Sequence, residues 1–393
     1  MRSLATGPYT NQQVVARLAD ASYAFGARFE ILEADLSVAG ELSVDEDTST
    51  PGAVMAALVE MNVDRDVKGS LSLRMVPDQR LVGQLFRKRI KAWWRIQMPD
   101  GGIAEFPMGV YVWNVPARSL QTVGIEEWSI VLGDQGHILN AGGPGDAGFT
   151  AFAGERITDA ITRAVQRIGF ADVSGITPLP SLVARDATWG LRDENNQIMT
   201  WTRVLTDLHL AAGCYSPVFD LAGRYRNILQ PDLTKAAIGW SYEPGQASLL
   251  IDAGEDAELD RIGNRVFVVS AAPESTIFGV AVADANALVP GHPLSQGEIG
   301  FYIDVLVEDQ VAATLVDMQL RAFNELVQRL SFYERMDIST LANPAHESFD
   351  VLRVAWPDDL ELDVGVRWHE RTWSFDLLEA RMTHQLRRLT DVA

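Results

Sequence analysis

WRIQMPDGGIAEFPMGVYVWNVPARSLQTVGIEEWSIVL, residues 94–132, alternates large apolar side chains with polar ones on both sides of a glycine turn. Apolar residues stand at every second position, such as Ile96 and Met98 before the turn and Val110 after it. A period of two is typical of β-strands that bury one face. Asp100–Gly102 predicts a hairpin turn, because glycine accepts the positive φ angles that tight turns need. The stretch therefore predicts an antiparallel sheet without any obvious catalytic group.

The rest of the 393-residue chain has the composition of a globular protein, and its length indicates two or three domains. Hydrophobic residues make up 47% and charged residues 22%, which is enough to build a substantial core. No apolar run approaches the roughly 20 residues that a membrane-spanning helix needs. The polar N-terminus lacks the apolar segment of a signal peptide. We therefore expect a chain that folds in a cytoplasm, does not insert into a membrane and does not use the general secretory route.

The net charge of −20, from 53 acidic and 33 basic residues, argues against a nucleic-acid-binding protein. It is compatible with a surface along which nucleic acid passes without sticking, because negative walls repel phosphates. The single cysteine, Cys214, excludes an intramolecular disulfide and a cysteine-based zinc site. We expect it to be a buried, unreactive thiol.

Strand patterns dominate both ends of the chain, and helical patterns interrupt them once in the middle. The first β region is predicted from alternation in five segments, which are 22–44, 63–76, 90–98, 103–114 and 122–132. A glycine-rich stretch with Pro144 then indicates a linker. The predicted first domain is therefore residues 1–149.

An α+β segment is predicted for residues 150–235. Apolar residues spaced by three or four predict one helix that ends at Gly169 and a second that ends at Gly213. A strand, a turn at 221–223 and another strand follow.

A second β domain is predicted for residues 236–393. It carries one long helix over 309–330, with Glu308 and Asp309 placed where a helix dipole favours acids. Further strands are predicted at 331–340, 349–356, 361–367 and 373–381.

The motifs that could carry chemistry are weak. Gly143–Gly148 matches G-x-G-x-x-G, but a proline stands inside it and no βαβ unit surrounds it, so we interpret it as linker. The acids at 45–47 lack the glycine and the final glutamate of a calcium loop, and those at 358–363 indicate a solvated loop. The six histidines have no i, i+3 or i, i+4 pair; they are His137, His209, His292, His346, His369 and His384. We predict no catalytic, cofactor-binding or metal-binding residue.

RKRIKAWWR, residues 87–95, is the one basic cluster, and it contains two tryptophans. Such a mixture can bind single-stranded nucleic acid. Because it leads into an alternating strand of an acidic protein, we favour contact with an acidic neighbouring subunit, with plain surface as the other interpretation. Tryptophans on predicted strand faces indicate core packing first and subunit interfaces second; they are Trp113, Trp128, Trp368 and Trp373.

Four stretches resemble the tail-tip or baseplate-hub proteins of tailed bacteriophages, above all the minor tail proteins of siphophages that infect actinobacteria. They are VDRDVKGSLSLRMV (63–76); KAWWRIQMPDGGIAEFPMGVYVWNVPARS with EEWSIVLGDQGHIL; the insert from ATWGLRDENNQ to NILQPDL; and NRVFVVS with the long helix and LEARMTHQLRRL. Pro107, Gly109, Val110, Tyr111 and Asp134 fall in the order of the family pattern, and Met108 replaces its common leucine. Residues 1–20 match no part of that pattern.

The resemblance implies a mainly β protein with an α+β insert, a long helix and two β-barrel domains similar to tail-tube subunits. Three copies would place six barrels in a ring at the tail tip, joining the sixfold tube to threefold tip proteins and lining the DNA channel used in ejection. The implied partners are two further copies, tube proteins above and tip or fibre proteins below, with genomic DNA passing unbound. The implied location is the virion, after assembly in the host cytoplasm, and the implied role is structural and not enzymatic.

Three alternatives stay open. The chain could be the hub of a contractile injection system or of a gene transfer agent. It could be a carbohydrate-binding receptor module that uses exposed tryptophans and acids. The insert could also contain a peptidoglycan hydrolase, for which Asp186, Asp193 and Glu194 are the candidate carboxylates.

Overall fold

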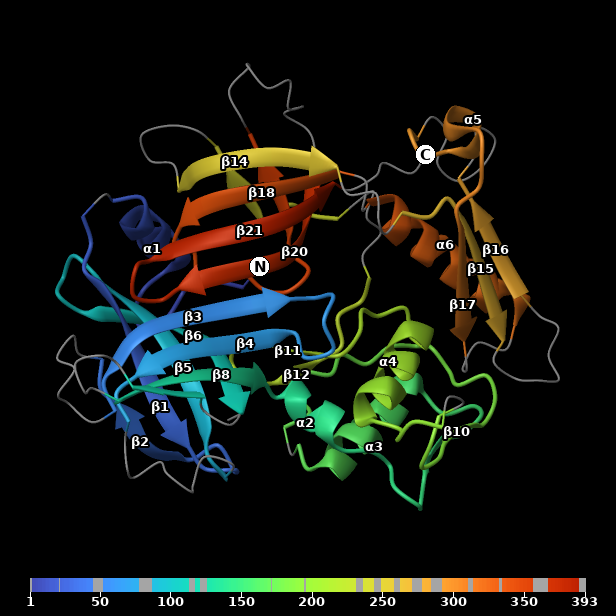
Figure 1. The fold of residues 1–393 in the computed structure, drawn as a ribbon, viewed down its shortest axis with the longest axis horizontal. Helices are drawn as coiled ribbons and strands as arrows, with labels where there is room; N and C mark the ends of the chain where they lie inside the picture. The colour runs from blue at the N-terminus through green and yellow to red at the C-terminus, as the bar shows by residue number, and fades with distance from the viewer. Residues whose placement is uncertain are drawn as a thin grey trace.

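The computed structural model describes residues 2–20, 22–44, 52–77, 87–112, 117–120, 126–170, 172–193, 196–230, 236–243, 249–257, 262–270, 278–283, 292–309, 314–331, 334–355 and 367–388. These residues are mainly β, which confirms the predicted class. Fourteen strands join one large sheet, and an α+β module and a small α/β unit lie beside it (Figure 1).

The large sheet combines strands from both ends of the chain. Its order is β14-β18-β21-β20-β3-β4-β8-β6-β5-β1-β2, with β7 paired to β8 and with β19 pairing both β13 and β20. The strands are β1 (Phe25–Leu32), β2 (Val38–Leu42), β3 (Val54–Asn62), β4 (Gly69–Met75), β5 (Arg89–Gln97), β6 (Ile103–Val112), β7 (Ala117–Leu120), β8 (Glu126–Asp134), β13 (Trp240–Tyr242), β14 (Leu250–Ala257), β18 (Glu334–Leu341), β19 (Val351–Val354), β20 (Arg367–Asp376) and β21 (Arg381–Arg388).

The two ends of the chain meet where β3 pairs with β20. Their antiparallel register sets Trp373 opposite Met61 and Phe375 opposite Val59. The described strands thus form a continuous path that crosses the boundary between the two predicted β domains. The two closed barrels implied by the resemblance are taken up below as a proposal.

The predicted hairpin at Asp100–Gly102 is confirmed. It joins β5 to β6, Gly101 has a φ of +84°, and the Met98 N–H donates to the Gly102 carbonyl at 2.8 Å. Further along β6 the register shifts near Gly109, whose φ is +124°. The ring of Tyr111 passes over this glycine and its hydroxyl donates to the Met108 carbonyl at 2.6 Å, so a Cβ there would lie only 2.3 Å from the hydroxyl oxygen.

The main core lies between the inner faces of the curved sheet. Trp94 of β5 packs on Phe375 of β20, with ring centroids 5.3 Å apart. The tryptophans predicted as core residues on strand faces, Trp128, Trp368 and Trp373, are buried, and Trp113 lies outside the described residues. Burying each such ring stabilises the fold by roughly 2 kcal/mol or more.

The N-terminal segment, which the family resemblance left unassigned, is part of this core. Helix α1 (Asn11–Leu18) begins with a capping box at Thr10 and buries Val14 and Leu18. The Arg2 guanidinium donates to the carbonyls of Pro107, at 2.6 Å, and Pro344, at 2.7 Å. It thereby joins the first and the last parts of the chain.

The α+β module has its own core and contains the two predicted helices. Its elements are α2 (Gly136–Ala141), β9 (Phe149–Ala151), α3 (Ile157–Ile168), β10 (Ala187–Trp189), α4 (Trp201–Ala211), β11 (Val218–Phe219) and β12 (Tyr225–Arg226). Gly169 ends α3 in the left-handed conformation, as predicted from glycine's lack of a Cβ. The predicted linker is wrong in part, because α2 forms within it and packs against α4.

The predicted long helix starts later than the sequence pattern indicated. The described residues between 262 and 331 form a separate small unit with its own core. Its elements are β15 (Arg265–Ser270), β16 (Phe278–Val282), α5 (Gln296–Ile299), β17 (Asp304–Asp309) and α6 (Leu315–Ser331). Glu308 and Asp309 lie in β17, paired with β15, and not at a helix start. Thr314 caps α6 instead, because its hydroxyl oxygen accepts from the Asp317 N–H at 3.2 Å.

The predicted strand 373–381 is also wrong at its end. β20 stops at Asp376, whose carboxylate accepts from the N–H groups of Leu378 and Glu379, and a turn leads into β21. The turn contains the buried apolar residue Leu377. The sequence therefore shows no polar break there, and the pattern did not predict the turn. The predicted strand 361–367 lies outside the described residues except for its last position. Among the described helices, none is both long and apolar enough to cross a membrane.

Candidate functional site

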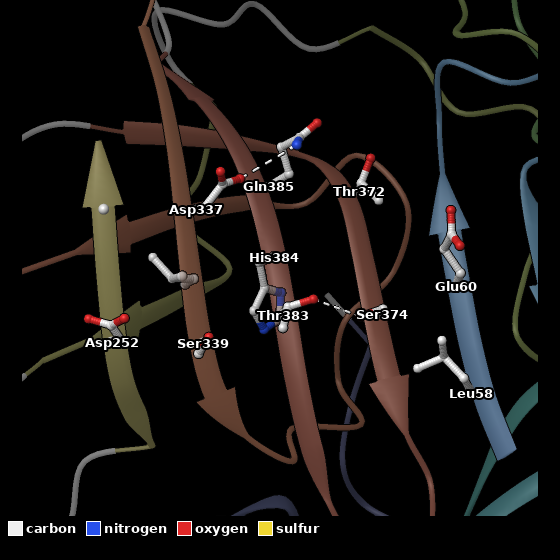
Figure 2. Close-up of a pocket in the computed structure, with 12 residues that line it drawn as sticks. Leu58, Glu60, Asp252, Asp337, Ser339, Thr372, Ser374, Thr383, His384 and Gln385 are labelled. Carbon is white, nitrogen blue, oxygen red and sulfur yellow. Dashed lines mark hydrogen bonds between the residues drawn. The ribbon is translucent and has the colours of Figure 1, made fainter. Parts of the chain in front are cut away.

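The outward face of β14, β18, β21, β20 and β3 forms a wide, shallow hollow of about 740 Å³ (Figure 2). Alternation along each strand sends one set of side chains into the core and leaves mainly polar side chains, together with Leu58, on this face. The polar side chains that line it are Glu60, Asp252, Asp337, Ser339, Thr372, Ser374, Thr383 and Gln385. We call this surface the hydroxyl face.

The hydroxyl face is weakly acidic and lacks the arrangement of a hydrolytic site. Ser374 and Thr383 bond to each other, with their hydroxyl oxygens 2.7 Å apart. Arg335 pairs with Asp337 at 2.7 Å. His384 stands in the same strand as Thr383, but its ring is buried and bonds to a carboxylate in the core. The hydroxyls therefore have no activating base from this histidine.

Beneath this face lies a buried cluster that the sequence did not reveal. The Glu370 carboxylate accepts from the Nδ1–H of His346 at 2.8 Å and from the Nδ1–H of His384 at 2.6 Å. The Tyr242 hydroxyl donates to His346 Nε2 at 2.5 Å, and the Thr340 hydroxyl donates to His384 Nε2 at 3.0 Å. The cluster ties β13, β18, β20 and β21 together.

The protonation states of the cluster follow from burial and from its own partners. Burial raises the pKa of Glu370, but the charges and N–H groups of the two imidazoles outweigh it and lower that pKa to about 2. Burial lowers the pKa of His346 below 6.5. At neutral pH Glu370 is therefore ionised.

His346, Glu370 and His384 are residue types that can bind a divalent cation, and their ligand atoms all lie within 4.8 Å of one another. Ligand atoms around a tetrahedral zinc ion would be about 3.3 Å apart. Here each Nδ1 lies at hydrogen-bond distance from its own carboxylate oxygen, and each Nε2 bonds to a hydroxyl. The geometry fits a satisfied hydrogen-bond network better than a metal centre.

Two further histidines are structural as well. His209 Nδ1 bonds to the Tyr215 carbonyl, and its Nε2 accepts from the Tyr225 hydroxyl, both at 2.8 Å. Burial lowers the pKa of His209 to about 4 and that of His369 to about 3. Both rings are neutral at pH 7, and Tyr215 stacks on His369 where the α+β module contacts the large sheet.

The G-x-G-x-x-G segment is a packing loop. Arg167 of α3 donates to the carbonyls of Gly148, at 2.6 Å, and Pro144, at 3.0 Å. A Cβ on Gly143 would lie 1.9 Å from the Met199 carbonyl, so close backbone approach requires the glycine. The loop leads into β9 of a two-stranded antiparallel sheet, not into the βαβ unit that a dinucleotide site needs.

The basic stretch 87–95 is engaged within the chain. Trp94 is buried, and the indole N–H of Trp93 donates to Glu30 at 2.8 Å. Lys91 lies over the Trp93 ring, 4.2 Å from its centroid, and Lys88 pairs with Glu33. Trp93 and Lys88 of this stretch therefore bind acidic residues of the same chain. The expected contact with an acidic neighbouring subunit stays a prediction.

Two of the three candidate carboxylates of the insert, Asp186 and Asp193, hold loop backbone in place. Asp186 accepts from the Ala153 N–H and Asp193 from the Gln197 N–H, each at 2.7 Å, so both stabilise loops. Glu194 and the acids at 45–47 and 358–363 lie outside the described residues. Cys214 is buried as expected, and burial raises the pKa of its thiol to about 12.

No family model and no curated protein matches the sequence. The fold, in contrast, matches solved structures along nearly the whole chain. The tail protein of Neisseria meningitidis MC58 superposes with a TM-score of 0.60 at 11% identity, over 93% of this chain and 98% of that one. The 43 kDa tail protein of prophage MuSo2 from Shewanella oneidensis also gives 0.60, at 10% identity, over 94% and 100%.

The chain has the fold of these tail proteins. A third similar structure is the Francisella PdpA-VgrG complex, with a TM-score of 0.53 at 8% identity. It matches over 94% of this chain but only 53% of that one. At these identities the likeness concerns the fold alone.

Proposed function

We propose that the chain is a structural protein of a phage tail, the hub at the tail tip, and that it has no catalytic role. The observation that carries the proposal is the fold match to two tail proteins, which spans 93% and 94% of this chain and 98% and 100% of theirs. The arrangement of polar groups supports it. His346, His384 and Glu370, which could act as acids or bases, are buried and hydrogen-bonded to one another. On the open face the hydroxyls of Ser374 and Thr383 bond to each other.

The proposed assembly is a homotrimer. Residues 1–149 and 236–393 would each supply one tube-like barrel, so three copies would present six units to the sixfold tube above and threefold symmetry to the tip proteins below. Pairing of β3 with β20 supports this plan, because it holds the two units of one chain side by side. Ring closure would also cover the sheet edges at β14 and β2, which pair with no further described strand.

The hydroxyl face is the proposed lining of the DNA channel. Short hydroxyl side chains and carboxylates such as Asp252 dominate this face, and the Arg335 guanidinium on it is paired with Asp337. Three copies would carry a formal charge of −60, from 3 × (−20), which opposes adhesion of DNA during ejection. Genomic DNA would pass without specific binding, and the chain would reside in the virion after assembly in the host cytoplasm.

The hub of a contractile injection system is a second candidate, favoured by the likeness to the PdpA-VgrG complex. The receptor-module alternative needs exposed tryptophans, and the strand tryptophans Trp128, Trp368 and Trp373 are buried.

Imaging a particle that contains this chain tests the proposal. The expected position is the tail axis between tube and tip, with three copies around the channel and the hydroxyl face turned inward. A position on a peripheral fibre, or a different copy number, would contradict it. A contractile sheath around the same axis would select the second candidate.

A further inference from the structure

The loop between β18 and β19, residues 342–350, is almost entirely buried. Seven of its nine residues are buried, and only Glu347 and Ser348 are partly exposed. Connecting loops normally run over the surface, because buried backbone groups need hydrogen-bond partners. This loop contacts three separate parts of the chain, which are the N-terminal segment, the buried cluster and the α+β module. We call it the junction loop.

The first half of the junction loop is fixed by the N-terminal segment and by the buried cluster. The Arg2 guanidinium donates to the Pro344 carbonyl at 2.7 Å, and the Arg2 N–H donates to the Ala345 carbonyl at 3.0 Å. The next residue, His346, donates its Nδ1–H to Glu370 at 2.8 Å. A shift of this part of the loop would therefore disturb the cluster.

The second half of the junction loop is held by the α+β module. The ring of Tyr215 lies flat on that of Phe349, with centroids 3.9 Å apart and an angle of 3° between the planes. Tyr215 is itself fixed in the module, because its carbonyl bonds to His209 Nδ1 at 2.8 Å. With Val63 and Val218 the two rings form a small core of their own, separate from the cores of the module and of the large sheet.

Phe349 has a backbone conformation that phenylalanine rarely adopts. Its φ is +68°, in the left-handed region, where a Cβ crowds the backbone. Strain of this kind persists only where surrounding contacts hold the residue in place. The Tyr215 ring is in direct contact with Phe349, whereas the centroid of the His369 ring is 6.0 Å away. The module therefore supplies the contact that holds the strained residue.

Packing beside this contact is incomplete. A cavity of about 30 Å³, which is room for about one water molecule, is lined by Val218, Glu347 and Ser348 among others. The module has a second anchor, because Leu221 in the turn between β11 and β12 belongs to the main core. Loss of the Tyr215 stack would therefore leave the module attached and give the junction loop room to shift.

We propose that the junction loop couples the α+β module to the strands of the hydroxyl face. While Tyr215 is stacked on Phe349, the loop keeps its strained form and His346 stays bound to Glu370. When the stack is lost, Phe349 relaxes to a negative φ, and the cluster that ties β18, β20 and β21 together loosens. This coupling does not depend on the proposed tail function.

Hydrogen exchange of the full chain tests the coupling with matched variants. Tyr215→Leu keeps an apolar side chain and removes the stack, and Phe349→Leu removes the same stack from the side of the loop. Tyr215→Phe keeps the ring and loses only the hydroxyl contact with His369, at 3.4 Å. Val204→Ala weakens the core of the module without touching the loop, because Val204 is fully buried in α4.

The coupling predicts where exchange changes. We expect both leucine variants to speed amide exchange at least tenfold in the junction loop and in β21, while β4 and β5 keep wild-type rates. Tyr215→Phe should match the wild type, and Val204→Ala should speed exchange in α3 and α4 alone. Faster exchange confined to the module in Tyr215→Leu, or an equal increase in every strand, would overturn the coupling.

Urea unfolding of Tyr215→Leu, Glu370→Gln and the double variant gives a second readout. Effects of independent sites on the unfolding equilibrium constant multiply. Because loss of the stack already loosens the cluster, Glu370→Gln should change this constant at least fivefold less in the Tyr215→Leu background than in the wild type. In the Val204→Ala background it should change it as much as in the wild type. Effects that multiply in the Tyr215→Leu background would refute the coupling.

Discussion

Replacing Glu370 by glutamine tests whether the buried cluster stabilises the fold in the way its geometry indicates. The carboxylate accepts one N–H from His346 and one from His384, at 2.8 and 2.6 Å. A glutamine side chain keeps one acceptor oxygen, and its amide N–H₂ then faces the other imidazole N–H. Neither imidazole can turn freely, because each Nε2 already accepts from a hydroxyl.

The expected cost follows from those two bonds. A hydrogen bond to a charged group contributes about 1.5–3 kcal/mol, and a buried donor without an acceptor costs about 1–3 kcal/mol. Glutamine also removes the cost of burying a charge, which offsets part of the loss. We therefore expect Glu370→Gln to lower the free energy of unfolding by about 3 kcal/mol at pH 7.

The measurement is urea unfolding followed by tryptophan fluorescence, because Trp94, Trp368 and Trp373 report on the main core. Glu379→Gln is the matched control, since Glu379 is exposed in the turn between β20 and β21, and a change below about 0.5 kcal/mol is expected there. If the Glu370 variant were as stable as the control variant, the cluster would not carry the stability assigned to it.

Three further predictions concern other buried contacts. His209→Gln should flatten the pH dependence of the free energy of unfolding. The folded-state pKa of His209 is lowered to about 4, so as the pH falls below 6.5 the unfolded chain binds this proton before the folded chain does. In urea titrations at pH 5, the wild type should have lost about 2 kcal/mol more stability than the variant, relative to neutral pH. Gly279→Ala should lower the melting temperature of the small unit, because its Cβ would meet the Met318 carbonyl, whereas Gly254→Ala, with open space around it, should change it little in a calorimetric comparison. Arg2→Ala should cost about 2–3 kcal/mol and speed hydrogen exchange in α1, because two carbonyls lose a charged donor; unchanged exchange would mean that this clamp is not needed.

Local patterns predicted the β character of the chain because they record local physics. The alternation at 94–132 reflects side chains of β5 and β6 that point in turn to the core and to solvent. The family-like residues of this region also have local explanations. Gly109 is required by the Tyr111 ring, and Asp134 accepts the N–H groups of Gly69, at 2.7 Å, and Gly136, at 2.8 Å, which joins β4 to the start of α2.

The sequence could not predict the pairings between distant segments. Nothing local shows that β3 pairs with β20, more than 300 residues later, or that the segment before α1 joins Pro107 to Pro344. The start of α6 was misplaced because Val311 continues the helical spacing of apolar residues backwards from Leu315, whereas the structure starts the helix after the Thr314 cap. The buried cluster was missed because it depends on long-range pairing: His346 and His384 are 38 positions apart and meet only in the folded sheet.

The positions of the polar groups agree with the prediction that the chain has no catalytic residues, and they support the proposed structural function. Four of the six histidines are buried, and the two in the cluster share one carboxylate, so the groups best suited to acid–base chemistry are used to hold strands together. On the open side of the same strands, the hydroxyls of Ser374 and Thr383 bond to each other. A catalytic face would need the reverse, with a base outside and hydroxyls activated by it. This distribution of polar groups supports the structural role proposed above.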